Sequence, residues 1–378
     1  MEGKLKPSFR IAPWHRPLSA FLALALLLLF SGAGAGDKSA LELFGARKDM
    51  ALGSPGFSSP RFSPDGKLIA FDACDKSRCE NVIYDIANDR YSAYRDKQGR
   101  RITNVSFSPS GKKLTFVVKG QKGFLWWAEP QDRIAVGSAQ DNRFTFITSP
   151  ESATKRYPEF WGEEAVLFIG EDPTGTGRRK GKYLYMAGVD GKTVRPLFKD
   201  FHASSPRPHP LSFYGPSRPR PLWDGKHVVL SDYAFSRKLV PLSEQQNVKF
   251  QDEVLRISIP DETVTLMPIA VTAPFLPAPA NAVKRLYVVG RLDRESAAAK
   301  YYVHDVFVVK EGKAERVSQL AVYIYGMDVN PDGTFLALVV PTPNRSFTNG
   351  RLLLYDTRNH SHRELKPKAV SELLIHID

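Results

Sequence analysis

The sequence predicts an all-β fold, a six-bladed β-propeller of four-stranded antiparallel blades. A turn motif returns at 62–66 (FSPDG), 107–111 (FSPSG) and 329–333 (VNPDG), and an apolar strand follows each copy. Strand-like segments recur in groups of four over about 45 residues, which is the spacing of one propeller blade. Six such units fit the 378 residues of the chain. Because one unit cannot bury its apolar face alone, we expect the copies to pack against one another.

The first residues have the layout of a secretory signal peptide. Basic residues precede an unbroken apolar run over 21–30, and small residues then lead to an A-x-A sequence at 33–35. We predict a signal peptide at 1–35 with cleavage after Ala35, a short linker at 36–56 and a propeller at 57–378. An uncleaved membrane anchor is the alternative, although the run is short for a span of about 20 residues. We expect a periplasmic or secreted protein.

The first two blades are predicted around two copies of the turn motif. Proline sets φ at the second turn position, and glycine takes the left-handed conformation that returns the chain to the ladder. The repeat-turn residues are Pro64, Asp65, Gly66, Pro109, Gly111, Pro331, Asp332 and Gly333. We expect strands of these two blades at 67–71, 82–86, 90–94, 105–107, 114–118, 123–128 and 144–147.

The remaining blades are predicted from apolar segments and turn residues. The strands expected in blades three to five are 157–160, 165–169, 182–186, 194–197, 227–230, 254–259, 264–267, 285–289 and 305–309. Blade six is expected from Gly326 to 352–356. The final strand-like segment, 373–377, is expected to pair within the first or last blade and help close the ring, since an open sheet edge invites aggregation. A frayed tail is the alternative.

Cys74 and Cys79 lie at the predicted hairpin tip of the first blade. In an oxidising compartment such a pair is expected to form a disulfide, and two free thiols are the alternative. Two cysteines without a nearby histidine are half of a metal-ligand set, so a metal site is not expected there.

The net charge of +13 favours contact with anionic polymers or membrane surfaces. The leader carries four Lys/Arg and one Glu, so its removal leaves +10. Charge spread evenly for solubility is the alternative. Nucleic acid is not an expected partner, because the leader directs the chain out of the cytoplasm. The membrane is expected as a partner only if the leader stays uncleaved.

A proline-rich stretch between blades three and four is a candidate binding strip. Guanidinium forks suit phosphate or carboxylate oxygens, and aromatic rings stack on sugars or apolar partners. The candidate binding residues are Arg207, His209, Tyr214, Arg218, Arg220 and Trp223. A solvated loop of the polyproline II type is the alternative.

The repeat resembles that of the TolB-like propeller family, whose blades read roughly aromatic-Ser-Pro-Asp-Gly, apolar strand, Ile-Tyr-x-x-Asp. Residues 62–66 with 83–85, and 330–333 with 354–356, carry this resemblance. It implies an exported propeller that binds a partner. TolB carries an α/β domain before its propeller, and 36–56 is too short for one, so the resemblance is to the propeller only.

No enzyme activity and no cofactor are expected. A serine hydrolase of the related peptidase type requires a G-x-S-x-G elbow, which the sequence lacks. Oligogalacturonate lyases are a similar family with a metal held largely by histidine, so a metal-dependent polysaccharide lyase is the alternative. Its ligands would come from His202, His209, His227, His304, His360, His362 and His376. We expect a monomeric scaffold that binds an envelope protein or an anionic polysaccharide.

Overall fold

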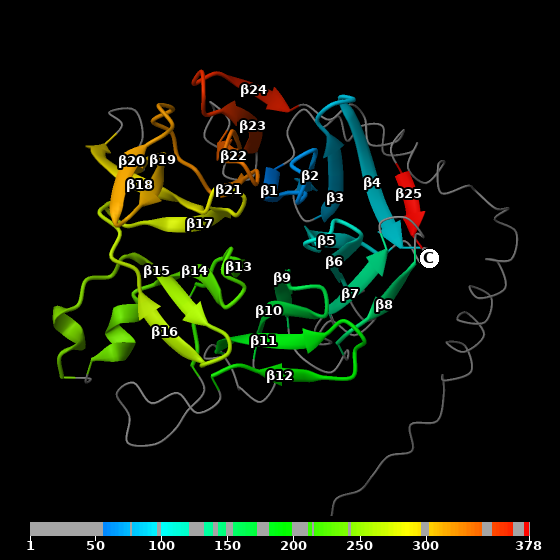
Figure 1. Ribbon diagram of the computed structural model, residues 1–378, viewed down its shortest axis with the longest axis horizontal. Coiled ribbons are helices and arrows are strands. Elements are labelled where there is room, and N and C mark those ends of the chain that lie inside the picture. The colour runs from blue at the N-terminus through cyan, green and yellow to red at the C-terminus, as the bar shows by residue number, and fades with distance from the viewer. Residues whose placement is uncertain are drawn as a thin grey trace, which may run out of the picture. The chain divides into compact units, whose positions relative to one another are not determined.

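The computed structural model describes residues 56–75, 78–96, 100–120, 132–138, 143–148, 154–171, 181–198, 211–213, 215–240, 243–295, 302–341, 350–365 and 374–377. The described strands form six sheets arranged around a common centre (Figure 1). Each sheet is a blade of four consecutive antiparallel strands, and the first gains a fifth strand from the C-terminal segment. The predicted six-bladed, all-β propeller is confirmed. The described residues contain no helix long and apolar enough to cross a membrane.

The strand bounds follow the order of the chain. Blade 1 contains β1 (Gly56–Phe62), β2 (Leu68–Asp75), β3 (Arg78–Asp85), β4 (Arg90–Asp96) and β25 (Leu374–Ile377). Blade 2 contains β5 (Ile102–Phe107), β6 (Lys113–Val118), β7 (Arg133–Ser138) and β8 (Phe144–Phe146). Blade 3 contains β9 (Lys155–Trp161), β10 (Ala165–Glu171), β11 (Lys182–Gly188) and β12 (Val194–Pro196).

Blade 4 contains β13 (Arg220–Pro221), β14 (His227–Tyr233), β15 (Asp252–Ser258) and β16 (Thr263–Leu266), with the short 3₁₀ helices η2 (Phe235–Leu239) and η3 (Gln245–Asn247) between β14 and β15. Blade 5 contains β17 (Phe275–Ala280), β18 (Arg285–Glu295), β19 (Tyr302–Lys310) and β20 (Lys313–Arg316). Blade 6 contains β21 (Gly326–Val329), β22 (Phe335–Pro341), β23 (Gly350–Asp356) and β24 (His362–Leu365).

One strand of blade 2 lies elsewhere than predicted. The third strand is β7, at 133–138, and it pairs with both β6 and β8. The predicted segment, 123–128, lies outside the described residues. Its aromatic residues resemble a strand, but the ladder position is taken by Ile134, Ala135 and their neighbours, which bury their side chains between the blades.

Six apolar clusters hold the ring together, one at each interface between neighbouring blades. The cluster between blades 6 and 1 joins Phe71 and Tyr84 to Val339 and Leu354. Five further clusters join blades 1–2, 2–3, 3–4, 4–5 and 5–6 in the same way. Side chains on the two faces of every blade are therefore buried against its neighbours, as a stack of amphipathic units requires.

The C-terminal strand pairs in the first blade, as predicted. β25 runs parallel to β4, with Leu374 opposite Ala93 and Ile377 opposite Asp96. It covers the outer edge of blade 1 and takes no place in blade 6. The innermost strand β1 of blade 1 packs against β21, β22 and β23 of blade 6, which brings the first and last blades together.

The repeated turns show why the motif needs its residue types. The N–H of Gly66 donates to Ser63 O at 2.9 Å, and the glycine has a φ of +71°. The Ser63 hydroxyl accepts from the N–H of Leu68, and the Asp65 carboxylate accepts from the N–H of Lys67. Ser or Asn at the start and Asp in the third position therefore satisfy backbone donors that the turn leaves unpaired.

The backbone register places the two cysteines opposite each other. Cys74 pairs with Cys79 across the β2–β3 ladder. Directly opposed strand residues lie within the reach that a disulfide requires. The disulfide itself stays a prediction.

We expect the unreduced mature protein to be lighter than the reduced protein by the mass of two hydrogen atoms, and Cys74→Ser to remove this difference. Because the bond closes a short loop, its loss should change the global stability little. Intact-mass spectrometry with and without reductant measures this. Two thiols that react with iodoacetamide in the native, unreduced protein would contradict the prediction.

Candidate functional site

The inner strands of the six blades present equivalent residues to the axis of the ring. The ladder registers align Arg61, Ser106, Glu159, Arg220, Ala278 and Asp328. Four of these, in blades 1, 2, 4 and 6, stand five residues before a turn glycine. All six are on strands that face the centre in Figure 1. Five of these six residues are charged or polar, and Ala278 of blade 5 is the exception.

A β-bulge directs these side chains inward in four blades. The register shifts just before Arg61, Ser106, Glu159 and Ala278. The residue two positions before each of these four has a positive φ. These residues are Ser59, Asn104, Tyr157 and Leu276. Proline follows Ser59, Tyr157 and Leu276. A bulge leaves one residue outside the ladder, and a proline at that position loses no ladder hydrogen bond. The bulge also changes the direction in which the next side chain points.

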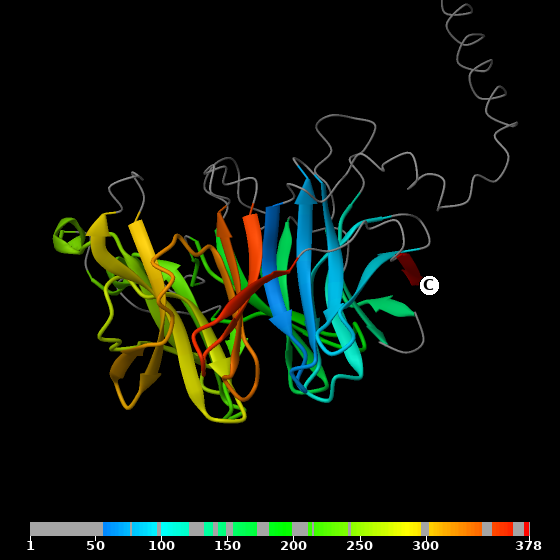
Figure 2. The same cartoon turned by 90° about the horizontal axis from the view of Figure 1, so that it is seen from above.

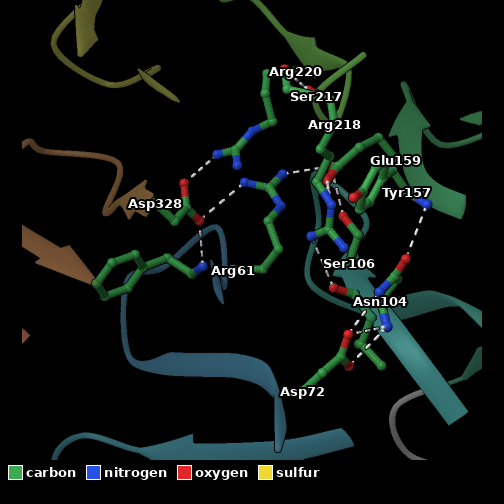
Figure 3. Close-up of polar contacts among 12 residues, drawn as sticks. Arg61, Asp72, Asn104, Ser106, Tyr157, Glu159, Ser217, Arg218, Arg220 and Asp328 are labelled. Carbon is green, nitrogen blue, oxygen red and sulfur yellow. Dashed lines mark hydrogen bonds and ion pairs between the residues drawn. The ribbon is translucent and has the colours of Figure 1, made fainter. Parts of the chain in front are cut away.

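Asp328 is the anionic centre on one side of the axis. Its carboxylate accepts from Arg61 Nη1 at 3.1 Å, forms a short ion pair with Arg220 Nη2, and accepts from the N–H of Phe62 at 2.7 Å (Figure 3). The side chain of Asp328 is fully buried, and that of Arg220 is 4% exposed. Burial alone raises the pKa of Asp328, but Arg220 and Arg61 outweigh it and hold the pKa below its usual value.

Glu159 is the second anionic centre. Its carboxylate accepts from Arg61 Nη2 at 2.6 Å and from the Ser106 hydroxyl at 2.8 Å, and Arg218 Nε lies 3.3 Å away. Arg61 therefore bridges Asp328 and Glu159, as Figure 3 shows. Burial lowers the pKa of Arg61, but the two carboxylates reverse this effect and raise it.

Asp72 and Asn104 extend the polar network between blades 1, 2 and 3. The Asp72 carboxylate accepts from the N–H of Asn104 at 2.9 Å and from Asn104 Nδ2 at 2.7 Å. The Asn104 amide oxygen in turn accepts from the N–H of Tyr157 at 3.2 Å. Burial raises the pKa of Asp72 in spite of these hydrogen bonds, so the surroundings disfavour the charged carboxylate relative to the neutral carboxylic acid.

The axial network has more cations than closely paired anions. Arg61, Arg218 and Arg220 share the carboxylates of Glu159 and Asp328. Burial, and then repulsion from Arg61, lowers the pKa of Arg220 to about 10. The Arg220 guanidinium therefore remains charged at neutral pH, while its burial and the repulsion from Arg61 favour additional negative charge beside it.

A funnel of about 320 Å³ opens above this network on the face that carries the repeated turns. In Figure 2, β1 (blue) runs toward this face. The same strand position of every blade contributes to its wall, namely Phe62, Phe107, Phe160, Pro221, Pro279 and Val329. Arg61 and Arg220 supply its charged lining, and the turn residues Pro64, Pro109 and Pro331 line it further out. Apolar walls around a few converging polar groups are typical of a binding site.

A smaller cavity of about 140 Å³ is lined by the bulge side of the inner strands. Ser59, Tyr157, Arg218 and Leu276 line it, whereas Arg61 does not. Arg220 lines both cavities. The network of arginines and carboxylates thus separates two spaces along the axis, and only the larger one contains both Arg61 and Arg220.

The candidate binding strip of the sequence analysis does not form one exposed loop. Arg220 starts β13 and is buried at the axis, and Arg218 is 9% exposed and pairs with Glu159. Trp223 is 38% exposed on the turn between β13 and β14. Arg207, His209 and Tyr214 lie outside the described residues. The alternative of a solvated loop does not hold for these two arginines, because ring closure brings their carboxylate partners, Glu159 and Asp328, from blades 3 and 6. Replacing both with serine is therefore expected to destabilise the fold.

The described histidines do not converge. His227 contacts Asp224 on a turn of blade 4, His304 is buried in β19 of blade 5, and His360 contacts Tyr355 in blade 6. Burial, and then Arg291, lowers the pKa of His304 to about 4. His362 is exposed in β24. Among the described residues no three His, Cys, Asp or Glu side chains cluster as metal ligands. His202 and His209 lie outside these residues, and of His376 only its place in β25 is described.

The sequence analysis missed Arg61, Glu159, Asp328 and Asp72 as functional candidates. A signal for two of them was present, since Arg61 and Asp328 hold the same place before their turn glycines as Arg220. Glu159 lacks that spacing, because blade 3 has a shorter turn, but it follows a proline as Arg61 and Arg220 do.

No family model matches the chain, and no curated protein matches it in sequence. Among solved structures it is similar to TolB from Acinetobacter baumannii, with a TM-score of 0.52 and 13% identity over 82% of this chain and 63% of that one. It is also similar to the acylaminoacyl peptidase of Pyrococcus horikoshii, with a TM-score of 0.50 and 14% identity over 82% of this chain and 44% of that one. The oligogalacturonate lyase of Vibrio parahaemolyticus gives a TM-score of 0.47 at 11% identity over 76% of this chain and 74% of that one.

These likenesses define the class of protein. The chain is a six-bladed β-propeller that matches the propellers of TolB and of related peptidases at low sequence identity. It spans 63% of the A. baumannii protein, and identities of this size show the fold alone. Function has to be argued from the site.

Proposed function

We propose that this chain is an exported, non-enzymatic β-propeller that binds a partner of the bacterial envelope, an envelope protein or an anionic glycan, in its axial funnel. The observation that carries this proposal is the funnel, a space of about 320 Å³ to which all six blades contribute apolar walls around Arg61 and Arg220. A rigid ring presents such a site without rearrangement, which keeps the entropic cost of binding low.

The predicted signal peptide and the positive net charge of the chain support an envelope partner that carries negative charge. The repeated turns at 63–66, 108–111 and 330–333 also suit binding, since each is fixed by its own side-chain hydrogen bonds. A metal-dependent polysaccharide lyase is the alternative function, and the experiment below distinguishes the two.

The proposal predicts that filling the funnel abolishes binding. Ala282 is exposed and lines the funnel, so Ala282→Trp places an indole in it. Val283 is 39% exposed and is the next residue, but it does not line the funnel, so Val283→Trp is the matched control. In pulldowns from envelope extracts we expect wild type and Val283→Trp to recover the same partner, and Ala282→Trp to recover less than about a tenth as much, because a steric block removes the contact area on which affinity depends.

Equal recovery by all three proteins would contradict the funnel as the binding site. If no protein recovered a specific partner, and the mature protein with added divalent metal released unsaturated sugars from an acidic polysaccharide, the lyase alternative would replace the proposal.

A further inference from the structure

Arg220 is buried at the base of the funnel with most of its hydrogen-bonding capacity unused. A guanidinium carries five N–H donors. Among the described residues only Asp328 accepts a hydrogen bond from Arg220, and Arg220 Nε is buried without a hydrogen-bond partner. A buried donor left unpaired costs about 1–3 kcal/mol, so each such group favours an acceptor from a ligand.

Arg61, in blade 1 on the other side of the axis, also has a buried Nε that is unpaired among the residues described. It donates to Asp328 and Glu159, while its Nε is buried and without a hydrogen-bond partner in the described part of the chain. Its side chain is 15% exposed, and it lines the funnel together with Arg220. The two guanidinium groups, joined through Asp328, thus stand at one end of a space that a ligand can enter.

The charge around this pair favours an anion. Arg61 and Arg220 share the carboxylates of Asp328 and Glu159 with Arg218, and Asp72, whose pKa burial raises, interacts with Arg218. The funnel walls are the apolar side chains of Phe62, Phe107 and Phe160. Apolar walls exclude water and strengthen attraction between the guanidinium groups and an incoming negative charge. The planar fork of a guanidinium matches the paired oxygens of a carboxylate or a phosphate.

We propose that Arg61 and Arg220 form an oxyanion site at the base of the funnel, which seats one carboxylate or phosphate group of the bound partner. This inference deepens the proposed function and rests on it. The oxyanion accepts hydrogen bonds from guanidinium N–H groups that Asp328 and Glu159 leave free, while the rest of the ligand lies along the proline and phenylalanine walls.

The test uses the mature protein and two simple oxyanions, acetate and inorganic phosphate, each titrated at constant pH and ionic strength against chloride. The Nε–Hε resonances of the arginines are followed by NMR, and that of Arg220 is assigned with Arg220→Lys. We expect a saturable shift of the Arg220 resonance. Tighter binding of acetate would point to a carboxylate on the partner, and tighter binding of phosphate would point to a phosphate group.

Arg218→Gln is the matched control for Arg220→Gln. Arg218 belongs to the same network and pairs with Glu159, but it lines the smaller cavity and not the funnel. We expect Arg220→Gln to weaken binding of the preferred oxyanion at least about tenfold, the usual effect of losing a charge-assisted pair, and Arg218→Gln to weaken it less than about threefold. In these variants oxyanion binding is read from the Arg61 Nε–Hε resonance. Near-UV circular dichroism checks that the variants fold.

If Arg220→Gln does not fold, Arg220→Lys serves instead, because it keeps the charge but loses the fork and should still weaken oxyanion binding. No saturable shift with either anion in wild type would overturn the site, and so would an equal loss in the Arg218 and Arg220 variants. If Ala282→Trp abolishes partner capture but neither anion shifts the arginine resonances, the funnel remains the binding site and the oxyanion inference fails. Saturable shifts without any captured partner would support the inference and count against the proposed function.

Discussion

Asp328→Asn is expected to lower the free energy of unfolding by about 3–5 kcal/mol at neutral pH, the cost of breaking a buried ion pair from one side. The substitution keeps the shape of the side chain but removes the charge that Arg220 and Arg61 share. Arg220 is almost fully buried and has no other carboxylate partner among the described residues. Equilibrium denaturation with urea, followed by intrinsic fluorescence, measures the change.

The control for this prediction is Asp190→Asn. Asp190 lies on the turn between β11 and β12, is 53% exposed and pairs with the exposed Lys192, so loss of its charge should change the stability by less than about 0.5 kcal/mol. Equal losses of stability in the two variants would show that the axial ion pairs do not support the fold.

The same pair gives an expected pH dependence. The folded protein holds the pKa of Asp328 below its ordinary value of 3.8. A carboxyl group whose pKa is lowered in the folded state stabilises the protein. This contribution is fully present above the pKa of the unfolded state and is lost as the pH falls through the pKa of the folded state. The difference in stability between wild type and Asp328→Asn should therefore stay constant near neutrality and shrink only below about pH 4. A difference that already declines between pH 7 and pH 5 would contradict the pairing.

Gly333→Ala is expected to destabilise the protein by about 2–5 kcal/mol, more than the same change at Gly66. Both glycines have left-handed backbone, with φ of +76° and +71°, so a side chain costs about 1–2 kcal/mol at either position. A Cβ on Gly333 would also lie 2.5 Å from Tyr287 Oη in blade 5, whereas at Gly66 the nearest atom is Pro331 Cδ at 3.5 Å. Overpacking a buried contact adds about 1–3 kcal/mol at Gly333 alone.

Tyr287→Phe tests the cause of this difference. The Tyr287 hydroxyl donates to Gly333 O at 3.2 Å, so Tyr287→Phe by itself should cost about 1 kcal/mol. Combined with Gly333→Ala it removes the colliding oxygen, and the double variant should lose less stability than the sum of the two single changes. Chemical denaturation of the four proteins measures the coupling. Strict additivity, or equal effects at Gly66 and Gly333, would mean that the contact between blades 5 and 6 is not the reason.

The strands were largely predictable because the cues that specify them are local. Alternating or continuous apolar runs, bounded by Gly, Pro and Asp, located most strands of blades 1, 3, 4 and 6. β17 was missed because Phe275–Ala280 contains two prolines, which argue against a ladder position. The bulge accommodates Pro277 without loss of a ladder bond, a feature that local propensity does not reveal.

The site was less predictable than the fold. Arg218 and Arg220 were binding candidates in the sequence because guanidinium groups suit oxyanions, but nothing in the sequence indicated that both side chains are buried. Their surroundings depend on Glu159 and Asp328, which come from other blades. Long polar side chains read from sequence are usually assigned to the surface, and only a partner of opposite charge makes their burial tolerable.

By itself the sequence determined a repeating β-module, the turns that separate its strands and the number of modules, because these follow from short-range patterns of apolar residues, Pro and Gly. Only the tertiary structure decided what the inner strands do. Arg61 and Asp328 are 267 residues apart and Arg61 and Glu159 are 98 apart, yet all three meet at the axis. The physical reason is closure of the ring, since burying both faces of every blade forces six innermost strands to converge, and their polar residues must then neutralise one another or a ligand.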